Sequence, residues 1–273
     1  MTVNPDDLRA LLAADLPIRS VTPLGSGLDH HAYAVDDDLV ARVAAGPDAA
    51  AEVRRDAAVL AVLPEYALLP VPEVVLARPE DGLLVYRRLT GQPLLTRTGR
   101  DAYAATLGAF LGRLHTAPVE RLSDIAGVDD TPPAAWLDEL REIAENLPDD
   151  VRRLAAGFLA GDPPEPSDRL VFTHNDLGAE HILVDGATVT GVIDWSDCAV
   201  ADPAADLGRL ARDLGTSALD TLMPGLDEQT RHRAMFYARC TTLEDYAFGL
   251  ESGRDDYLRN ARRAVGELFS DQR

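Results

Sequence analysis

Lysine is absent from this sequence, and basic residues of any kind are scarce. All 26 basic residues are arginines, against 46 acidic residues, and the formal net charge is -20. A chain this acidic is poorly suited to bind nucleic acid or an anionic membrane surface, so we expect neither as a partner. The charge would suit a cationic substrate, although solubility is the more ordinary explanation.

Cysteines and long apolar runs are also few. The two cysteines, Cys198 and Cys240, have neither metal-ligand nor disulfide spacing, and we expect them to be reduced or buried. No apolar run reaches membrane-spanning length. The N-terminus has no basic stretch followed by an apolar core, as a secretory signal has. These features favour a cytoplasmic protein.

The chain is long enough for a substantial core, with 273 residues of which 46% are hydrophobic. Its first third reads mainly as strands, preceded by one helix and interrupted by another. The N-terminal helix has an N-cap at Asn4, a proline at the next position and acids in its first turn. We expect strands over 20–24, 32–35, 39–43 and 83–86, and helices over about 4–14 and 48–63.

Beyond Gly91 the pattern becomes helical. A sheet followed by a mainly helical region predicts an α+β fold with a cleft between two lobes. We place the N-terminal nucleotide-binding lobe at 1–90 and the C-terminal helical lobe, with the catalytic and substrate sites, at 91–273. Helices are expected over about 103–114, 134–146, 203–214, 227–252 and 255–269.

Two acidic residues follow short apolar runs on either side of a predicted hairpin. Asp176 follows one run, and Asp194 follows the second strand of the hairpin, whose turn is Asp185-Gly186. This fold-back brings Asp194 across from His181 and near Asp176. A carboxylate that accepts a hydroxyl proton, beside a pair able to hold a metal, is what phosphoryl transfer requires.

Three motifs in order carry a family resemblance: His174-Asn175-Asp176-Leu177, Ile193-Asp194-Trp195 and Asp202-Pro203-Ala204-Ala205-Asp206-Leu207. Together they resemble the aminoglycoside phosphotransferase family, over about residues 21–268. The resemblance implies a protein-kinase-like two-lobe fold with a small, mainly antiparallel N-terminal sheet. It also implies a small-molecule kinase that uses ATP or GTP, Mg²⁺ (with Mn²⁺ as an option) and a small hydroxylated acceptor.

In this resemblance Asp176 is the catalytic base and His174 an orienting residue. Asp194 is the principal Mg²⁺ ligand, since this ion prefers carboxylates, phosphate oxygens and water. His181 stands where protein kinases carry a metal-binding Asn, although imidazole more often binds softer metals. It either contacts the metal directly or hydrogen-bonds a phosphate oxygen or a metal-bound water.

Several N-terminal residues are candidates for nucleotide binding. Gly25-Ser26-Gly27 is the expected phosphate-covering turn. With no lysine available, Arg42 is the only cation on a predicted strand that can face the triphosphate. Asp56 on the following helix is its expected partner, with Glu52 as the alternative. Backbone groups near Arg87 and Leu89 are expected to meet the nucleotide base, which leaves ATP or GTP open.

The acceptor is harder to predict. Acids on the C-terminal lobe would attract a cationic acceptor, whereas Arg209 and Arg212 stand where aminoglycoside enzymes tend to carry acids. An antibiotic acceptor, and hence antibiotic resistance, is one option, and a metabolic sugar or amino alcohol is close behind. The candidate acceptor-binding residues are Asp197, Asp213, Glu244 and Asp245.

Two other functions are considered: one remains open and the other is disfavoured. Arginine for lysine at position 42, and histidine for asparagine at position 181, leave room for a catalytically silent nucleotide-binding module. A protein kinase is disfavoured, because only six residues separate Trp195 from Asp202, too few for a regulated activation segment.

Overall fold

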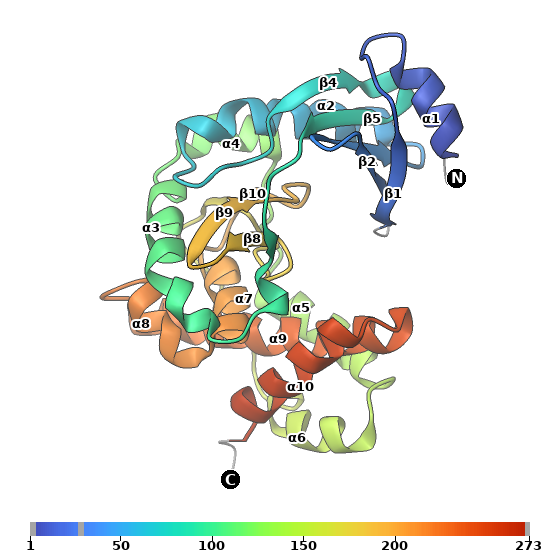
Figure 1. The fold of residues 1–273 in the computed structure, drawn as a ribbon. Helices are drawn as coiled ribbons and strands as arrows, with labels where there is room; N and C mark the ends of the chain where they lie inside the picture. Colours follow the sequence, from blue (N-terminus) through green and yellow to red (C-terminus); the bar gives the residue numbers. More distant parts are fainter. Residues whose placement is uncertain (1–3, 27–29, 271–273) are drawn as a thin grey trace.

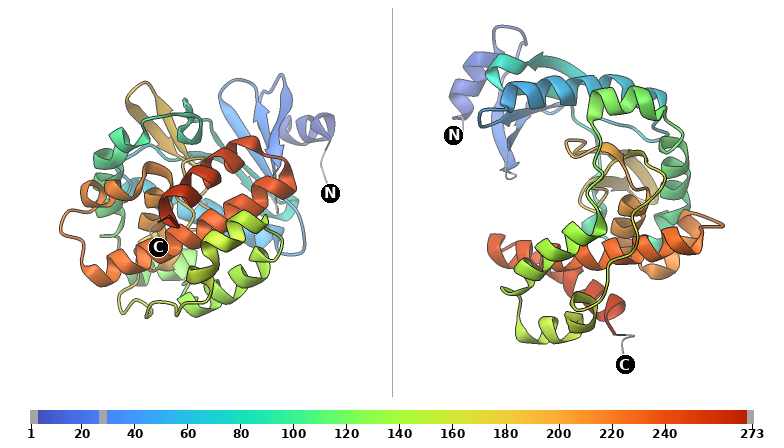
Figure 2. Two further views of the ribbon diagram at one scale, coloured as in Figure 1. Left: turned by 90° about the horizontal axis from the view of Figure 1, so that it is seen from below. Right: turned by 180° about the vertical axis from the view of Figure 1, so that it is seen from behind.

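The computed structural model describes residues 4–26 and 30–270. A five-stranded sheet forms one end of the molecule and a group of helices forms the other (Figure 1). A middle region of short strands and helix α3 joins the two ends along one side. The views from below and behind show the same arrangement (Figure 2). The predicted α+β architecture is confirmed.

The N-terminal sheet is antiparallel throughout, with strand order β1-β2-β3-β5-β4. Helices α1 and α2 pack against it, and α1 begins as predicted, with the Asn4 side chain accepting a hydrogen bond from the backbone of Asp6 at 2.9 Å. The elements are α1 (Pro5–Leu12), β1 (Val21–Ser26), β2 (His30–Val35), β3 (Leu39–Ala44), α2 (Ala49–Val62), β4 (Val74–Arg78) and β5 (Leu83–Arg87).

The two faces of this sheet belong to different cores. Leu12 of α1 packs in a small cluster with Val43 of β3. Leu60 of α2 and Leu84 of β5 belong to the main core. Because successive strand side chains point to opposite faces, Arg42 points away from the α1 side, toward α2 and the helical part of the molecule.

The C-terminal part is mainly helical. Of the helices in the described ranges, none is both long and apolar enough to span a membrane. Helix α7 is buried along its whole length beneath α9. The helices are α3 (Ala104–Leu114), α4 (Val119–Ala126), α5 (Pro133–Ala144), α6 (Asp149–Leu159), α7 (Ala204–Leu214), α8 (Leu219–Leu222), α9 (Glu228–Ser252) and α10 (Asp255–Leu268).

Short strands in this part carry the motifs. The predicted hairpin forms, since β8 pairs with β9 and Gly186 takes the turn with φ of +57°. Strand β6 extends this hairpin, and β10 pairs antiparallel with β7. The strands are β6 (Gln92–Pro93), β7 (Val171–Thr173), β8 (Ile182–Asp185), β9 (Thr188–Val192) and β10 (Ala199–Ala201). Short 3-10 helices connect other elements: η1 (Leu63–Glu65), η2 (Pro79–Asp81), η3 (Leu94–Thr96), η4 (Arg100–Tyr103) and η5 (Thr216–Ala218).

The structure adds elements that the sequence did not reveal, among them the strands β4, β6 and β10 and the helices α4, α6 and α8. The last strand of the N-terminal sheet in chain order ends at Arg87, and β6, which pairs with β8, begins at Gln92. We therefore keep the proposed lobe boundary at 90/91. Cys198 and Cys240 are both buried and unbonded to each other, consistent with the prediction of buried thiols.

Candidate active site

The loop after β7 is held in an unusual backbone conformation. Asn175 has φ of +64°, a left-handed geometry that is unfavourable for a residue with a Cβ. The buried carboxylate of Asp206 accepts hydrogen bonds from the backbone N–H groups of His174 and Asn175, at 3.0 and 2.9 Å. The Asn175 amide donates to Asp129 at 2.8 Å. These contacts stabilise the turn and set the direction of the next side chain, Asp176.

His174 connects this loop to the end of the hairpin and takes no proton itself. Its ring is completely buried. Burial, with the nearby positive charge of His181, lowers the pKa of His174 to about 4. Nδ1 accepts from the backbone N–H of Asp176 at 3.3 Å, so the proton lies on Nε2 and is donated to the Ile193 carbonyl at 3.0 Å. These two hydrogen bonds hold the ring between the loop and the end of the hairpin, and the predicted orienting role of His174 stays a prediction.

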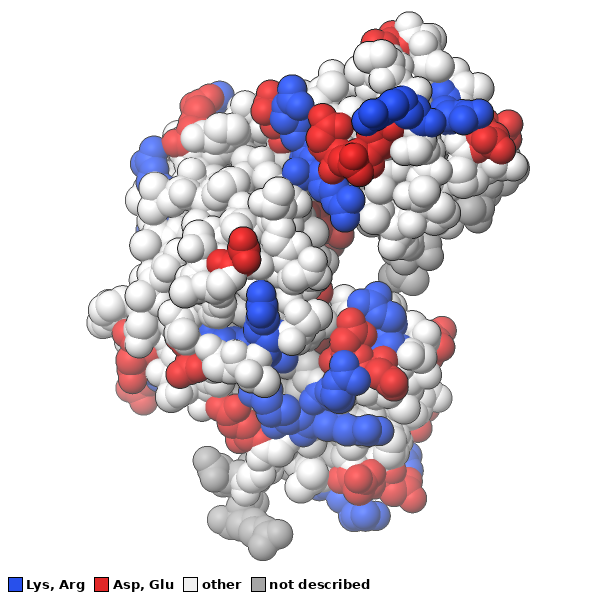
Figure 3. Space-filling view, in the orientation of Figure 1, with Lys and Arg blue, Asp and Glu red and all other residues white. Residues whose placement is uncertain are grey.

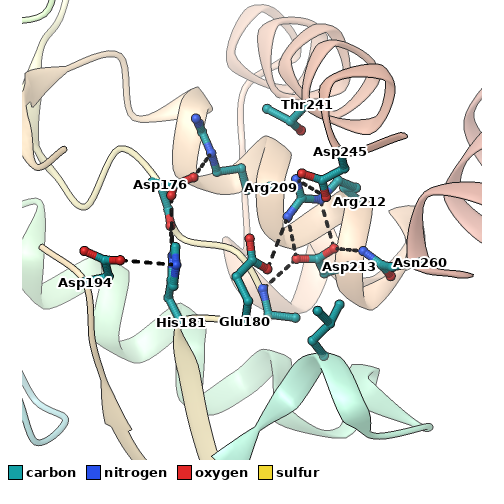
Figure 4. Close-up of polar contacts among 12 residues, drawn as sticks. Asp176, Glu180, His181, Asp194, Arg209, Arg212, Asp213, Thr241, Asp245 and Asn260 are labelled. Atoms are coloured by element: carbon teal, nitrogen blue, oxygen red, sulfur yellow. Dashed lines mark hydrogen bonds and ion pairs between the residues drawn. The ribbon is translucent and has the colours of Figure 1, made fainter. Parts of the chain in front are cut away.

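His181 lies between the two predicted carboxylates (Figure 4). Its Nδ1 donates to the backbone oxygen of Asp176 at 2.9 Å. On its other side, Nε2 lies 3.7 Å from Oδ2 of Asp194. Asp194 has φ of +61°, and its Oδ1 accepts a hydrogen bond from Ser196 at 3.0 Å. The predicted trio thus converges at one place, with one imidazole nitrogen aimed at a carboxylate.

The charges in this trio support each other. Burial alone would disfavour all three charged forms. The carboxylates of Asp176, Glu180 and Asp194 outweigh it and raise the pKa of His181 to about 9. In the same way, His181 and Arg209 outweigh burial and lower the pKa of Asp176. Asp176 is thus an anion near neutral pH.

Arg42 reaches the trio from the N-terminal sheet. Its guanidinium lies 3.3 Å from Asp56 on α2 and 3.5 Å from Asp194. It also shares a 2.9 Å contact with Nδ1 of His30. The predicted ion pair of Arg42 with Asp56 is therefore present, whereas the alternative partner, Glu52, is exposed. Arg42 links the sheet to the residue predicted to hold the metal.

A cleft of about 530 Å³ opens above these residues. The space-filling view shows the molecule hollowed on this side, between the sheet and the C-terminal helices (Figure 3). Gly25 lines the cleft from the end of β1, next to Ser26, while Gly27 lies outside the described residues. Other lining residues include Arg42, Tyr86, Leu89, His181 and Asp194.

The two residues predicted to meet the nucleotide base differ in position. Leu89 lines the cleft. The backbone N–H of Arg87 instead donates to the carbonyl of Glu73 at 2.8 Å, across the β4–β5 edge. That N–H is therefore already used within the sheet, and Arg87 is a less suitable contact than Leu89.

A second cavity, of about 540 Å³, is lined by Asp176. We call it the Arg209 pocket, after the lining arginine that is hydrogen-bonded to Asp176. It is lined by Arg55, Ala126, Gly127, Val128, Asp129, Trp136, Asn175, Asp176, Ser196, Asp197, Ala199 and Arg209.

The four predicted acceptor-binding acids fall into different environments. Asp197 is exposed in the Arg209 pocket. Glu244 is half-buried on α9, and burial raises its pKa. Asp245 is bound to Arg212 at 2.9 Å. Asp213 is fully buried, where Arg212, Asn260 and the Ala179 backbone all donate to it. Asp213 therefore has no free oxygen for an acceptor.

The sequence did not predict that Arg209 contacts Asp176. Nε of Arg209 donates to Oδ1 of Asp176 at 3.1 Å (Figure 4). The available signal was its spacing from Asp206. Residues three apart on a helix share a face, so a helix that presents Asp206 to the Asp176 loop presents Arg209 there too.

Comparisons with known proteins agree with this geometry. A model described as "Phosphotransferase enzyme family" matches residues 20–238. An aminoglycoside 3'-phosphotransferase of Streptomyces fradiae is 33% identical over 164 residues, which are 54% of this chain and 59% of that protein. A homoserine kinase of Pseudomonas aeruginosa strain UCBPP-PA14 is 29% identical over 170 residues, covering 57% of this chain and 52% of that protein. The chain thus matches little more than half the length of either relative.

Solved structures show the same fold over nearly the whole chain. The GDP complex of aminoglycoside 2'-phosphotransferase-IIIa has a TM-score of 0.75 at 22% identity, covering 99% of this chain and 100% of that one. The apoenzyme of a macrolide 2'-phosphotransferase from Brachybacterium faecium has a TM-score of 0.66 at 23% identity, covering 98% and 99%. At such identities the likeness establishes the fold alone.

Proposed function

Because this chain belongs to the phosphotransferase enzyme family, we propose that it transfers the γ-phosphoryl group of ATP or GTP to a hydroxyl of a small molecule. The observation that carries this proposal is the convergence of four side chains: His181 lies within 3.5 Å of Asp176 and 3.7 Å of Asp194, and Arg42 lies 3.5 Å from Asp194. Arg42, His181 and Asp194 line the cleft, and Asp176 lines the Arg209 pocket. Phosphoryl transfer depends on positioning and on charge neutralisation, and these residues supply both.

The nucleotide is proposed to lie in the cleft above Arg42. The turn that begins at Gly25 would cover the phosphates, since a glycine backbone can approach an anion closely. Arg42 would bridge phosphate oxygens with its planar guanidinium. Leu89 lines the part of the cleft where the base would bind.

A divalent ion is proposed to bind at Asp194 and at Nε2 of His181, whose proton would be released to solvent when the ion binds. No group of three or more metal-ligating side chains occurs within 4–26 and 30–270, but Mg²⁺ commonly takes only one or two carboxylates and draws its other ligands from phosphate and water. Nε2 of His181 faces Asp194, because Nδ1 is used by the Asp176 carbonyl. A bound Mg²⁺ or Mn²⁺ would neutralise charge on the phosphates.

Asp176 is proposed to orient the acceptor. The acceptor oxygen attacks the γ-phosphorus, the bond from that phosphorus to the bridging oxygen breaks, and the hydroxyl proton passes to Asp176. The low pKa of Asp176, held down by His181 and Arg209 against burial, keeps the carboxylate ready to accept the hydrogen bond.

The acceptor is proposed to enter from the Arg209 pocket, which is lined by Asp176. Asp197, Glu244 and Asp245 stay as proposed acceptor contacts, and we leave Asp213 out because it is saturated. An aminoglycoside or macrolide antibiotic is one candidate, as two relatives' names suggest. A metabolic kinase is the second, favoured by the Arg209 guanidinium beside the catalytic carboxylate and by the homoserine kinase relative.

Mass spectrometry tests the proposal directly. The protein is incubated with ATP or GTP, with Mg²⁺ or Mn²⁺, and with a panel of aminoglycosides, macrolides, sugars, amino alcohols and amino acids. We expect a mass increase of one phosphoryl group on at least one acceptor. D176N should abolish this product while still binding nucleotide, and D162N, an exposed loop substitution, should retain it.

Two results would contradict this function. One is a wild-type protein that binds neither nucleotide in the presence of either ion. The other is full activity in D176N. Nucleotide binding without turnover of any acceptor would instead favour the catalytically silent module.

A further inference from the structure

Arg209 carries a donor that the fold does not use. The Arg209 side chain is only 9% exposed, and its Nε is bound to Asp176. Its Nη1 is buried and has no hydrogen-bond partner among the residues the structure describes. The guanidinium lies over the Trp136 ring, 5.7 Å from the ring centre, which restricts its movement. A charged donor is thus held in place at the wall of the Arg209 pocket.

An unpaired N–H of a charged group is costly to bury, because water solvates it well. Most buried donors in folded proteins have a partner for this reason. Arg209 therefore has a vacant bonding position, and its side chain lines the pocket. A guanidinium pairs best with a carboxylate or another planar anion.

The other charged side chains that line the pocket differ in whether they already have hydrogen-bond partners. Arg55 is fully used, since it donates to the backbone carbonyls of Ala126, Ser196 and Cys198. Asp129 accepts from Asn175 and Thr131.

Asp197 is the remaining acid beside Asp176, and no hydrogen bond or ion pair is found for it in the described residues. Although Asp197 is exposed, the protein around its carboxylate partly desolvates it and raises its pKa, and the neighbouring carboxylates of Asp176 and Asp194 add to this. A cation beside Asp197 would relieve that repulsion.

We propose that the acceptor is a hydroxylated amino acid, a zwitterion whose carboxylate binds Nη1 of Arg209 and whose ammonium group lies against Asp197. This inference rests on the proposed function, and it narrows the acceptor to one chemical class. Arg209, Asp197 and Asp176 all line the same pocket, so one amino acid bound there would place its carboxylate, ammonium and hydroxyl groups among these three side chains. A polycationic antibiotic lacks the anion that Arg209 requires.

The first test uses the wild-type protein and matched acceptors. Hydroxylated L-amino acids with side chains of one, two and three carbons are each compared with two analogues. The primary amide removes the negative charge, and the corresponding hydroxy acid without the amine removes the positive charge. We expect kcat/KM to fall about 10- to 100-fold for each analogue, since each leaves a charged side chain unpaired.

The second test assigns the carboxylate contact to Arg209. In R209Q, the preference for the amino acid over its amide should fall to about one, and R209K should retain part of it. R153Q, an exposed arginine on α6, should behave as wild type. An equal loss with acid and amide would mean that Arg209 acts on Asp176 or on the phosphoryl group, and would overturn the proposal. If R209Q does not fold, the wild-type acid-to-amide ratio decides.

The outcomes separate this inference from the proposed function. Phosphorylation of neutral or cationic acceptors only, or nucleotide binding with no turnover of any hydroxylated amino acid, overturns the zwitterionic acceptor and leaves a phosphotransferase possible. Failure to bind nucleotide at all overturns the proposed function first. A wild-type preference for the amide over the acid also contradicts the proposal.

Discussion

Arg42 forms ion pairs that connect the N-terminal sheet to α2 and to the C-terminal part. It contacts Asp56 from α2 and Asp194 from the end of the hairpin. The Arg42 side chain is 15% exposed, so water screens these pairs less than it screens a surface pair. Removing the guanidinium would leave two neighbouring carboxylates without their shared cation.

We predict that R42A raises the nucleotide KM about 10- to 100-fold, as expected for losing a hydrogen bond between charged groups. R42K should lose less, because it keeps the charge but not the planar fork. R54A, an exposed substitution on α2, is the control. Steady-state kinetics with saturating acceptor measures the change, and an unaltered KM would count against Arg42 as a phosphate contact.

His115 makes stability depend on pH. Burial, with a contribution from Arg169, lowers its pKa to about 4 from 6.5, and its buried Nε2 has no partner among the described residues. A histidine with a depressed pKa stabilises the fold above pH 6.5 and loses that contribution as pH falls from 6.5 toward 4.

We therefore predict that the wild type loses at most about 3 kcal/mol more than H115Q over this interval, as measured by urea unfolding at a series of pH values. Between pH 7.5 and 8.5 the difference between the two proteins should be constant. A difference that does not change with pH anywhere would show that His115 is charged in the fold or solvated.

Some single residues could be predicted from the sequence and others could not. Asp176, His181 and Asp194 could, because one short hairpin with an Asp-Gly turn fixes their relation. The contact of Arg209 with Asp176 could not, because it depends on how α7 packs beneath a loop that precedes it by about thirty residues in the chain. From the sequence, the arginine at position 209 indicated only that a polycationic acceptor is disfavoured.

At the scale of elements, α7 supports the loop that carries Asp176, the proposed catalytic base. Asp206 accepts from two consecutive backbone N–H groups of that loop, and the left-handed backbone of Asn175 depends on such support. The position of Asp176 thus depends on Asp206 of α7, which does not line the proposed nucleotide cleft.

We predict that D206N lowers kcat about 100-fold, with little change in the nucleotide KM. The amide would turn a donor toward one of the two backbone N–H groups, and a displacement of Asp176 by about 1 Å is enough for such a loss. The free energy of unfolding should fall by about 2 kcal/mol. Kinetics and urea unfolding measure both, with D220N, an exposed site, as the control.

The elements that the sequence did not reveal have identifiable reasons. β4 is a five-residue strand between prolines, too short for a clear alternation. α6 begins after Pro148 with Asp149 and Asp150, the same pattern that identified α1. That signal was present and was overlooked, whereas β4 depends on the neighbouring β5 for its existence.

At the scale of the whole molecule, Arg55 connects the two parts. It extends from α2 and donates to the carbonyls of Ala126, Ser196 and Cys198, all in the C-terminal part. These carbonyls lie close behind Asp194, so the helix that carries Asp56 and the segment that carries the predicted metal ligand are held together.

We predict that R55A lowers the free energy of unfolding by about 2–4 kcal/mol, because it leaves three carbonyl groups without their donor. R54A, at the preceding position on α2, removes an exposed arginine that pairs with exposed Glu80, and should change it by less than about 0.5 kcal/mol. Thermal and urea unfolding of both variants provide the comparison. Similar stability in R55A and R54A would show that the connection contributes nothing.

The pairing of β10 with β7 has a further consequence. The stretch after Asp194, which protein kinases use as a mobile segment that phosphorylation rearranges, is here a strand bonded to the one that leads into Asp176. We expect no off state built from that stretch. We therefore expect the proposed activity to depend on the amount of protein and on the supply of acceptor, without a switch in this segment.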